Sequence, residues 1–237
     1  MWRIVSGRGG RGGQTGPLGP SDKVAAVSAS ASTEQGRATR LRIVAAAAVL
    51  IGERGVAGTS LDDVRAATSS SKSQLYHYFG DKHGLVQAVI DHQSAVVLGA
   101  QAEALGAVQD WDDLERWADG IVAVTEQRNS RGGCPIGTLA AALADSDERF
   151  RAALSDAFAN WREEIGGALA RLRDNGLLGP DADLETLTTT MLAAIQGGLL
   201  LAKTSRDSTL LRAALDGAIA QLQVHRAREK PRARRRC

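Results

Sequence analysis

Apolar residues follow the helical period along most of the chain, beginning near Arg37. The first stretch has them at i, i+3, i+4, i+7 and i+8, which is one face of an amphipathic helix: Ile43, Ala46, Ala47, Leu50 and Ile51. Gly55 then stands where a left-handed residue commonly ends a helix. Since no alternating run of β-branched residues competes, the pattern predicts an all-α protein.

Two short helices are predicted next. Ser60 is the expected N-cap of the first, with two aspartates in its first turn, where the helix dipole favours negative charge. Val64 and Ala67 are expected to form its inner face. Ser71 and Gln74 have the spacing of a capping box, which predicts the start of the second helix.

The helical pattern then continues to the end of the chain, interrupted by turn signals. Asp81 can cap a helix that begins at Lys82 and runs beyond Ala100. Glycine, asparagine and aspartate steps separate the remaining helices, which are predicted at 111–129, 135–145, 147–175, 183–204 and 208–224.

A long helix followed by two short ones is the pattern of a helix-turn-helix, whose second short helix enters the major groove of DNA. Leu75 and Phe79 lie one turn apart and can pack inward against the preceding helices. The opposite face then carries side chains that suit a duplex, namely Lys72, Ser73, Tyr76 and His77.

The run Leu-Tyr-His-Tyr-Phe, followed after a glycine by Asp-Lys, is a highly specific motif. With it, residues 39–85 resemble the DNA-binding domain of the TetR family. The other residues that carry the resemblance are Thr39, Arg40, Ile43, Ala46, Ala47, Leu50, Ile51, Glu53, Arg54, Gly55, Thr59, Ser60, Val64, Ala67, Ser71 and Lys72.

The resemblance implies a role for each matching residue. Base edges would be contacted by Lys72, Ser73 and Tyr76, while Gln74 would lie between base and backbone. Phosphates would be held by Ser60, His77, Tyr78 and Lys82, and Ser71 completes the predicted DNA-binding set. Two alternatives stay open, because Tyr78 can serve mainly as a packing residue and His77 as an ordinary surface histidine.

Three positions depart from the family pattern. The turn usually carries glycine and then an apolar residue, whereas this chain has Ser69 and Ser70. Serine tolerates a left-handed turn less well than glycine, so the turn geometry is the least secure part of the resemblance. Asp62 lies where some members contact the operator with a cation, and its charge would repel phosphate.

A second resemblance covers residues 133 to about 215. The segments 133–139, 145–150 and 196–202, together with Trp161, resemble the LmrA/YxaF-type branch. That branch implies release of DNA when an aromatic drug or flavonoid binds. Candidate effector-binding residues are bulky or polar side chains on predicted helices: Trp117, Ile121, Cys134, Phe158, Trp161, Met191 and Gln196. Each could equally be core filler.

The last two predicted helices are expected to form a dimer interface. Gly197 and Gly198 permit close helix approach, and the family uses the equivalent pair for a four-helix bundle between two copies. A two-fold homodimer presents two recognition helices about one DNA turn apart, which predicts a roughly palindromic double-stranded operator.

Composition excludes other classes of function. The two cysteines are too few for the disulfide framework of a secreted protein, so a cytoplasmic location is expected. The four histidines form no His-x-x-x-His pair, and neither a Gly-x-Ser-x-Gly elbow nor a phosphate loop after a strand occurs. The longest apolar run, 43–52, is too short to cross a bilayer. We expect no enzyme activity, cofactor, metal or membrane partner.

These observations predict four parts: a disordered arm over 1–36, a DNA-binding domain over 37–83, an effector-binding and dimerisation domain over 84–225, and a basic tail over 226–237. The predicted function is a DNA-binding repressor, released from its operator by a small aromatic or hydrophobic effector. A ligand-independent or thiol-responsive regulator is the alternative. Cys134 precedes a proline at a helix start, where the dipole can lower a thiol pKa, although a buried structural cysteine fits as well.

Overall fold

The computed structural model describes the backbone of residues 20–227 and the side chains of residues 34–227. The chain divides into two compact units, 1–41 and 42–237. Within the described residues the chain forms nine α-helices and no sheet: α1 (Pro20–Arg54), α2 (Leu61–Thr68), α3 (Lys72–Phe79), α4 (Lys82–Gly106), α5 (Trp111–Gln127), α6 (Pro135–Leu143), α7 (Glu148–Asp174), α8 (Leu184–Ser205) and α9 (Thr209–Val224).

The beginning of α1 differs from the prediction. The helix starts at Pro20 rather than near Arg37, so residues 20–36 are helical instead of an irregular arm. Proline suits the first helical position, and the segment that follows is rich in alanine, the best helix former. The predicted arm over 1–19 lies outside the described residues.

The other helices confirm the all-α prediction, with ends within two residues of the predicted ones from α5 onward. Aspartates supply four of the eight N-caps from α2 to α9. The side chains of Asp81, Asp110 and Asp183 each accept a backbone amide three residues ahead, and Asp147 accepts the amides of Arg149 and Phe150. These caps fix where each helix begins.

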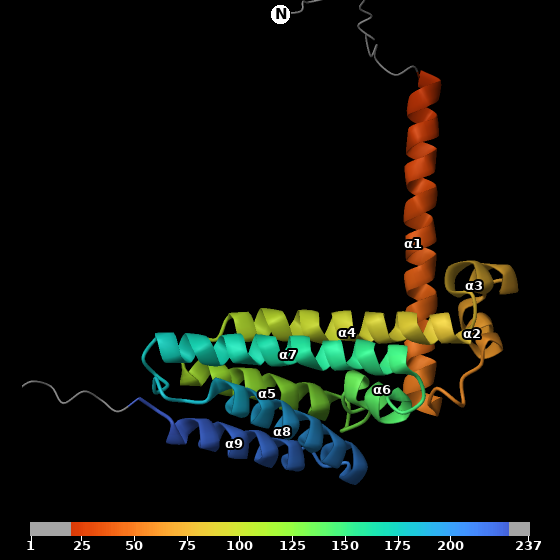
Figure 1. Ribbon diagram of the computed structural model, residues 1–237. Coiled ribbons are helices and arrows are strands. Elements are labelled where there is room, and N and C mark those ends of the chain that lie inside the picture. Colours follow the sequence, from red (N-terminus) through yellow and green to blue (C-terminus); the bar gives the residue numbers. More distant parts are fainter. Residues whose placement is uncertain (1–19, 228–237) are drawn as a thin grey trace, which may run out of the picture. The chain divides into compact units, whose positions relative to one another are not determined.

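Helices α4 and α7 lie side by side and run in the same direction (Figure 1). At one end, His83 Nε2 lies 2.9 Å from Asp147 Oδ2, and the His83 ring stacks on Phe150. At the other end, Arg171 Nε donates to the Val108 carbonyl at 3.1 Å. Side-chain contacts therefore join α4 and α7 at both ends of the pair. Helix α4 directly follows α3 in the chain and so connects the DNA-binding helices to this bundle.

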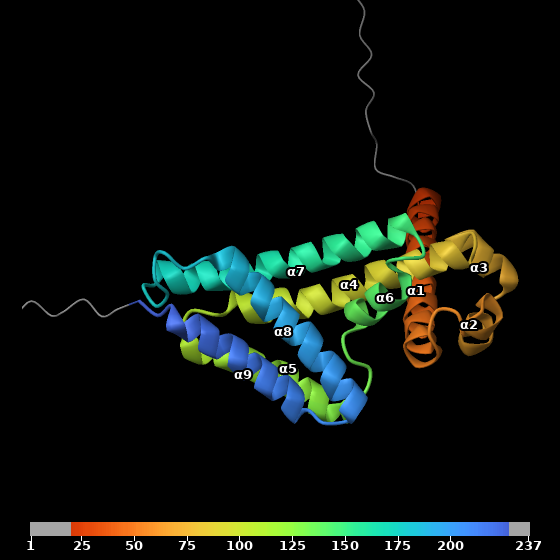
Figure 2. The same cartoon turned by 60° about the horizontal axis from the view of Figure 1, so that its bottom comes forward.

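Helices α8 and α9 form a close antiparallel pair on the other side of the bundle (Figure 2). A Cβ on Gly198 would lie 3.1 Å from Leu211 Cα and 3.2 Å from Ala214 Cβ, so glycine favours the close approach of the two helices. By length and composition α8 alone among the described helices could cross a bilayer, but core helices of soluble proteins share those properties, and α8 packs against both α7 and α9.

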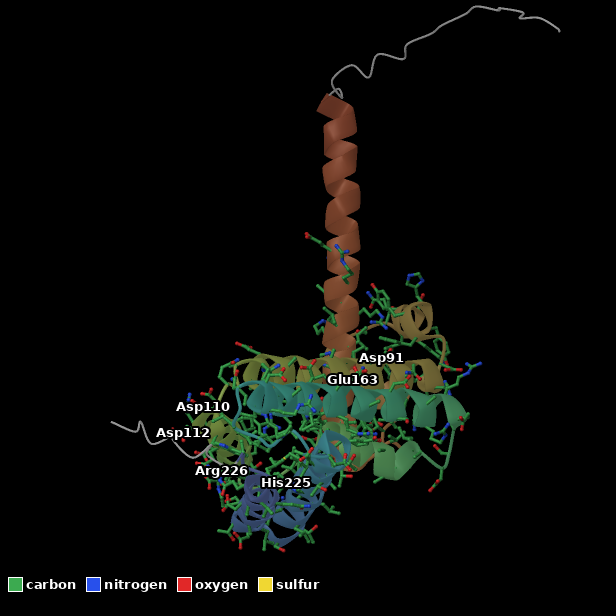
Figure 3. The ribbon with its side chains drawn as sticks, turned by 60° about the vertical axis from the view of Figure 1, so that its left-hand side comes forward. Asp91, Asp110, Asp112, Glu163, His225 and Arg226 are labelled. Carbon is green, nitrogen blue, oxygen red and sulfur yellow. The ribbon has the colours of Figure 1, made fainter. Side chains whose placement is uncertain are left out.

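The chain after α9 folds back onto the bundle. Gly179 N donates to the His225 carbonyl at 2.7 Å, and the Arg226 guanidinium lies 4.8 Å from the centre of the Trp111 ring. Figure 3 shows Arg226 at the same end of the bundle as Asp110, at the start of α5. Arg226 is thus part of the folded domain rather than of the predicted tail, of which residues 228–237 lie outside the described residues.

Candidate DNA-binding face and ligand cavity

The inner faces of α2 and α3 hold the two helices together. Val64 and Leu75 are buried, and so is Phe79. The prediction that Ala67 joins this inner face is wrong, because Ala67 is exposed and Thr68 is buried instead. Thr68 lies one turn beyond Val64, and its hydroxyl donates to the Val64 carbonyl at 2.8 Å, which satisfies the polar group inside the core.

The turn between α2 and α3 contains Ser69 and Ser70 at the two positions where the family pattern has glycine and an apolar residue. Ser69 adopts the left-handed conformation, with φ of 52°, and its amide donates to the Arg65 carbonyl. Ser70 is buried, and its hydroxyl is hydrogen-bonded to that of Thr68 at 2.9 Å. Arg42 on α1 donates to the Thr68 carbonyl, which ties the turn to the preceding helix.

The outward face of α3 is the predicted one. Lys72, Ser73 and His77 are exposed, and Tyr76 exposes 48% of its surface. The Lys72 ammonium lies 5.8 Å from the centre of the Tyr76 ring, close enough for a cation–π contact that orders both side chains. Since α3 contains no acidic residue, this face offers a cation and hydrogen-bonding groups without a charge that repels phosphate.

The predicted capping box is present in α3, and α2 has a capping box as well, at the predicted N-cap Ser60. In α3, Ser71 Oγ accepts from Gln74 N at 3.1 Å, and Gln74 Oε1 accepts from Ser71 N at 2.9 Å. In α2, Asp63 Oδ2 accepts from Ser60 N at 2.8 Å. The hydrogen bonds from the Ser60 hydroxyl and amide lower the pKa of Asp63. This negatively charged carboxylate therefore occupies the position next to Ser60 where a phosphate is predicted to bind.

The remaining predicted phosphate ligands lie at the junction of α3 and α4. Tyr78 is half-buried beside the core, and its ring centre is 5.2 Å from that of His77. Lys82 is the first residue of α4 and is partly exposed. A Cβ on Gly84 would lie 2.0 Å from the Phe79 carbonyl oxygen, so glycine allows the close turn that brings Lys82 beside α3.

The C-terminal bundle contains a cavity of about 620 Å³ between α4, α5 and the segment that leads into α6. Its lining is mainly apolar and comes largely from two helices: Gln93, Val96, Val97, Ala100, Gln101 and Ala104 of α4, and Arg116, Trp117, Gly120, Ile121, Val124 and Thr125 of α5. Trp117 Nε1 donates to Gln101 Oε1 at 2.8 Å, which fixes the ring in the wall. The volume suits a drug-sized ligand.

The structure divides the predicted effector residues among three places. Four of them line the 620 Å³ cavity: Trp117, Ile121, Cys134 and Trp161. Phe158 and Gln196 line a neighbouring cavity of about 420 Å³, to which Cys134 also contributes. Met191 is fully buried in the core and lines neither cavity.

Sequence reasoning missed the α4 wall of the larger cavity and its arginines. Val96 and Val124 are apolar yet about half exposed, at 54% and 45%, because they face this hollow rather than a neighbouring helix. On the sequence alone, such valines are indistinguishable from core positions. Arg128 and Arg131, which also line the cavity, follow α5 and look like ordinary surface cations.

Two buried polar groups near the cavities have no hydrogen-bond partner among the described residues, namely Trp161 Nε1 and Gln196 Nε2. Cys134 is also buried, at 7% exposure, and burial raises the pKa of its thiol. The dipole of α6 does not overcome this desolvation, so the thiolate is disfavoured. Among the described residues no cluster of His, Cys, Asp and Glu is suited to a metal ion.

Comparisons with known proteins agree with both halves of this architecture. Residues 43–89 match the family model of bacterial regulatory proteins of the tetR family. Residues 111–229 match the model of the LmrA/YxaF-like transcriptional regulator C-terminal domain.

Individual relatives give the same result. An HTH-type transcriptional regulator in the lacX 3′ region of Lactococcus lactis subsp. lactis is 32% identical over 185 residues, 76% of this chain and 91% of that protein. The HTH-type transcriptional regulator LmrA of Bacillus subtilis is 26% identical, covering 73% of this chain and 90% of its own length. The crystal structure of a TetR transcriptional regulator from Chloroflexus aurantiacus superposes with a TM-score of 0.73 at 27% identity, covering 81% and 98% of the two chains.

Proposed function

Because this chain belongs to the TetR family of transcriptional regulators and ends in an LmrA/YxaF-like C-terminal domain, we propose that it represses transcription and leaves its operator when a small hydrophobic ligand binds. It is a DNA-binding regulator and not an enzyme. The proposal extends this to a cytoplasmic homodimer on a roughly palindromic operator.

DNA reading is assigned to α3. Lys72, Ser73 and Tyr76 point outward together on an acid-free helix, which supports base-edge contacts in the major groove. Lys82 lies next to them at the start of α4, where free backbone amides favour phosphate, and the half-buried Tyr78 lies near the end of α3. We assign His77 to phosphate as well, and Ser71 and Gln74 to positioning the helix through their mutual cap.

Ser60 is the least favoured member of the predicted set. Its amide and hydroxyl are already bound to the Asp63 carboxylate, at 2.8 Å and 2.5 Å. A phosphate would have to displace or approach that negative charge. We therefore place Ser60 at the edge of the interface, as the cap of α2.

Dimerisation is assigned to α8 and α9, which expose small and apolar residues on successive turns. On α8 these are Ala193, Gly197, Leu200 and Leu201, and on α9 they are Ala213, Gly217, Ala220 and Val224. Leu200 and Val224 are 63% and 81% exposed in the single chain, which is costly unless another surface covers them. A second copy of the same pair of helices would bury them in a four-helix bundle.

The observation that supports ligand control is that the 620 Å³ cavity shares lining residues with a second cavity beside α1. A smaller cavity of about 110 Å³ adjoins α1 at Ile51 and Gly52. Four residues line both this cavity and the 620 Å³ one: Gln93, Arg128, Gly133 and Pro135. A ligand that shifts these residues would shift the packing under α1, and with it the DNA-binding helices, so that ligand and operator favour different states.

The alternative of a thiol-responsive regulator is not favoured. Cys134 is buried and its thiol pKa is raised, whereas redox-sensing cysteines are exposed and rich in thiolate. A ligand-independent regulator would have a solid C-terminal core, and the 620 Å³ cavity argues against that alternative.

The test is an electrophoretic mobility shift with the duplex upstream of the chain's own gene. Lys72→Ala should weaken binding to that duplex by about tenfold and reduce its preference over unrelated DNA. Lys82→Ala should weaken specific and unrelated duplexes alike and reduce the salt dependence by about one phosphate contact. No retarded complex at moderate salt, or equal effects of both variants on both duplexes, would contradict the assignment of α3.

A further inference from the structure

The 620 Å³ cavity is an elongated slot with two different ends. Along α5 its lining runs from Trp117 through Ile121 and Val124 to Arg128, which is one face of the helix over about three turns. At 1.5 Å per residue, these eleven steps span roughly 16 Å. Helix α4 runs in the opposite direction, and Gln93 shares the smaller cavity with Arg128, so both mark the same end.

The middle of the slot is apolar. It is lined by short aliphatic side chains: Val96, Val97, Ala100, Ile121 and Val124. At the far end, Gln101 Oε1 accepts the N–H of the Trp117 indole. The middle of the slot provides no charge for a ligand and favours an apolar body.

The end near α6 is cationic. Arg128 and Arg131 line it, and neither has a salt-bridge partner within the described part of the chain. Arg116, in contrast, lines the opposite end and is paired with Asp113. Among the described residues that line the slot there is no aspartate or glutamate. The slot therefore combines unpaired positive charge at one end with an apolar interior.

Arg128 is the better placed of the two cations. Arg131 also lines a polar cavity that contains Glu126 and Asp207, which lower the local positive potential. Neither of the two cavities that Arg128 lines contains a carboxylate. One of them adjoins Ile51 of α1, so a charge held by Arg128 lies at the DNA-binding side of the slot.

We propose that this slot binds an elongated hydrophobic anion, whose apolar body lies along the valines and whose acidic group meets Arg128. The inference rests on the proposed function, since it names the charge class of the ligand that occupies the cavity. An anionic group supplies the unpaired guanidinium with a charge-assisted hydrogen bond. A hydrophobic cation would face two arginines with no carboxylate to receive it.

The test uses two fluorescent probes that share one ring system. Anilinonaphthalene sulfonate is an anion, and N-phenylnaphthylamine is the same ring system without the sulfonate. Arg128→Gln should weaken binding of the sulfonate by about tenfold and leave the neutral probe within about twofold, as expected for loss of one charge-assisted hydrogen bond. Arg149→Gln, on an exposed turn of α7 outside the cavities described, is the matched control and should change neither.

Two further measurements make the outcome decisive. In the unaltered protein, added salt should weaken binding of the sulfonate but not of the neutral probe. Ala100→Trp fills the middle of the slot and should weaken both probes, which shows that they bind there.

Each contrary outcome has a distinct meaning. If the neutral probe binds and Arg128→Gln or salt changes both probes equally, the anion proposal is overturned while the effector cavity stands. If neither probe binds, or Ala100→Trp changes neither, the slot is not a ligand site, and the proposed ligand control fails together with the anion proposal.

Discussion

At the scale of single residues, the turn between α2 and α3 shows how a departure from the family pattern is accommodated. Ser69 takes the left-handed conformation that glycine adopts without strain. For a residue with a Cβ this conformation costs roughly 1–2 kcal/mol. The neighbouring Thr68, Ser70 and Arg42 hold the turn through hydrogen bonds to one another and to the Thr68 carbonyl. The strain is therefore tolerated because the surroundings fix the turn.

Ser69→Gly should stabilise the protein, since glycine adopts φ of 52° without the cost that serine bears. We expect the free energy of unfolding to rise by about 1 kcal/mol, because the relieved strain exceeds the added entropy of the unfolded chain. A chemical denaturation curve measures this. Ser70→Gly is the matched control and should destabilise, because Ser70 is buried and bonded to Thr68; a stable Ser70→Gly with an unstable Ser69→Gly would contradict the account of the turn.

At the scale of elements, helix ends were predictable from the sequence because they depend on local chemistry. Ser71 and Gln74 three residues apart form the predicted capping box, and Asp81 caps α4 as expected. The start of α1 was not predicted correctly. The prediction gave more weight to the Gly-rich beginning of the chain than to the helix propensity of the alanines after Pro20.

Properties that depend on contacts between distant residues could not be predicted in the same way. The helical period alone could not separate exposed Ala67 from buried Thr68, because the choice depends on how α2 sits against its neighbours. Nor could it show that Val96 of α4 and Val124 of α5 face one cavity. Of the predicted effector residues, Trp117 and Trp161 line that cavity, whereas Met191 does not, since every bulky helical residue looks alike before packing is known.

The start of the α4–α7 pair predicts an acid dependence of stability. A hydrogen bond from His83 is the largest cause that lowers the pKa of Asp147 from its ordinary value of 3.8. A carboxyl whose folded pKa lies below its unfolded value stabilises the fold above the unfolded value, and that contribution is lost as pH falls through the folded pKa.

Asp147→Asn keeps a good N-cap for α7 but removes the charge that His83 recognises. The variant should be less stable than the unaltered protein at pH well above 3.8, and the difference should shrink as the solution is acidified below that value. Urea denaturation across this pH range measures it. Asp145→Asn, at an exposed neighbouring carboxylate, is the control; a difference that is constant with pH, or equal in both variants, would exclude the His83 contact as the cause.

At the scale of the whole molecule, the proposed function requires that two recognition helices reach one side of the duplex, so it depends on the α8 and α9 surface to which we assign dimerisation. Gly197 and Gly198 are neighbours with different environments. A Cβ on Gly198 would meet Leu211, whereas one on Gly197 would meet nothing within 4 Å. Gly198 therefore serves packing within one chain, while Gly197 lies on the exposed face that we assign to the partner copy.

Gly197→Arg should leave the single chain folded, since arginine is a better helix former than glycine, position 197 is exposed, and a Cβ there meets no atom within 4 Å. In a four-helix bundle of two copies, the same charge would be buried without a partner and should prevent association. Sedimentation velocity should then show a monomer, and operator affinity should fall by at least about a hundredfold, because one half-site replaces two.

Gly106→Arg is the matched control, at an exposed glycine near the end of α4 that also has no neighbour within 4 Å. It should remain a dimer with unchanged operator binding. If Gly197→Arg also remains a dimer with full affinity, the two-fold contact lies elsewhere, and the exposed leucines of α8 need another occupant. If it is monomeric yet binds the operator as before, α3 reads DNA without a partner, and the palindrome inferred from dimer symmetry is wrong.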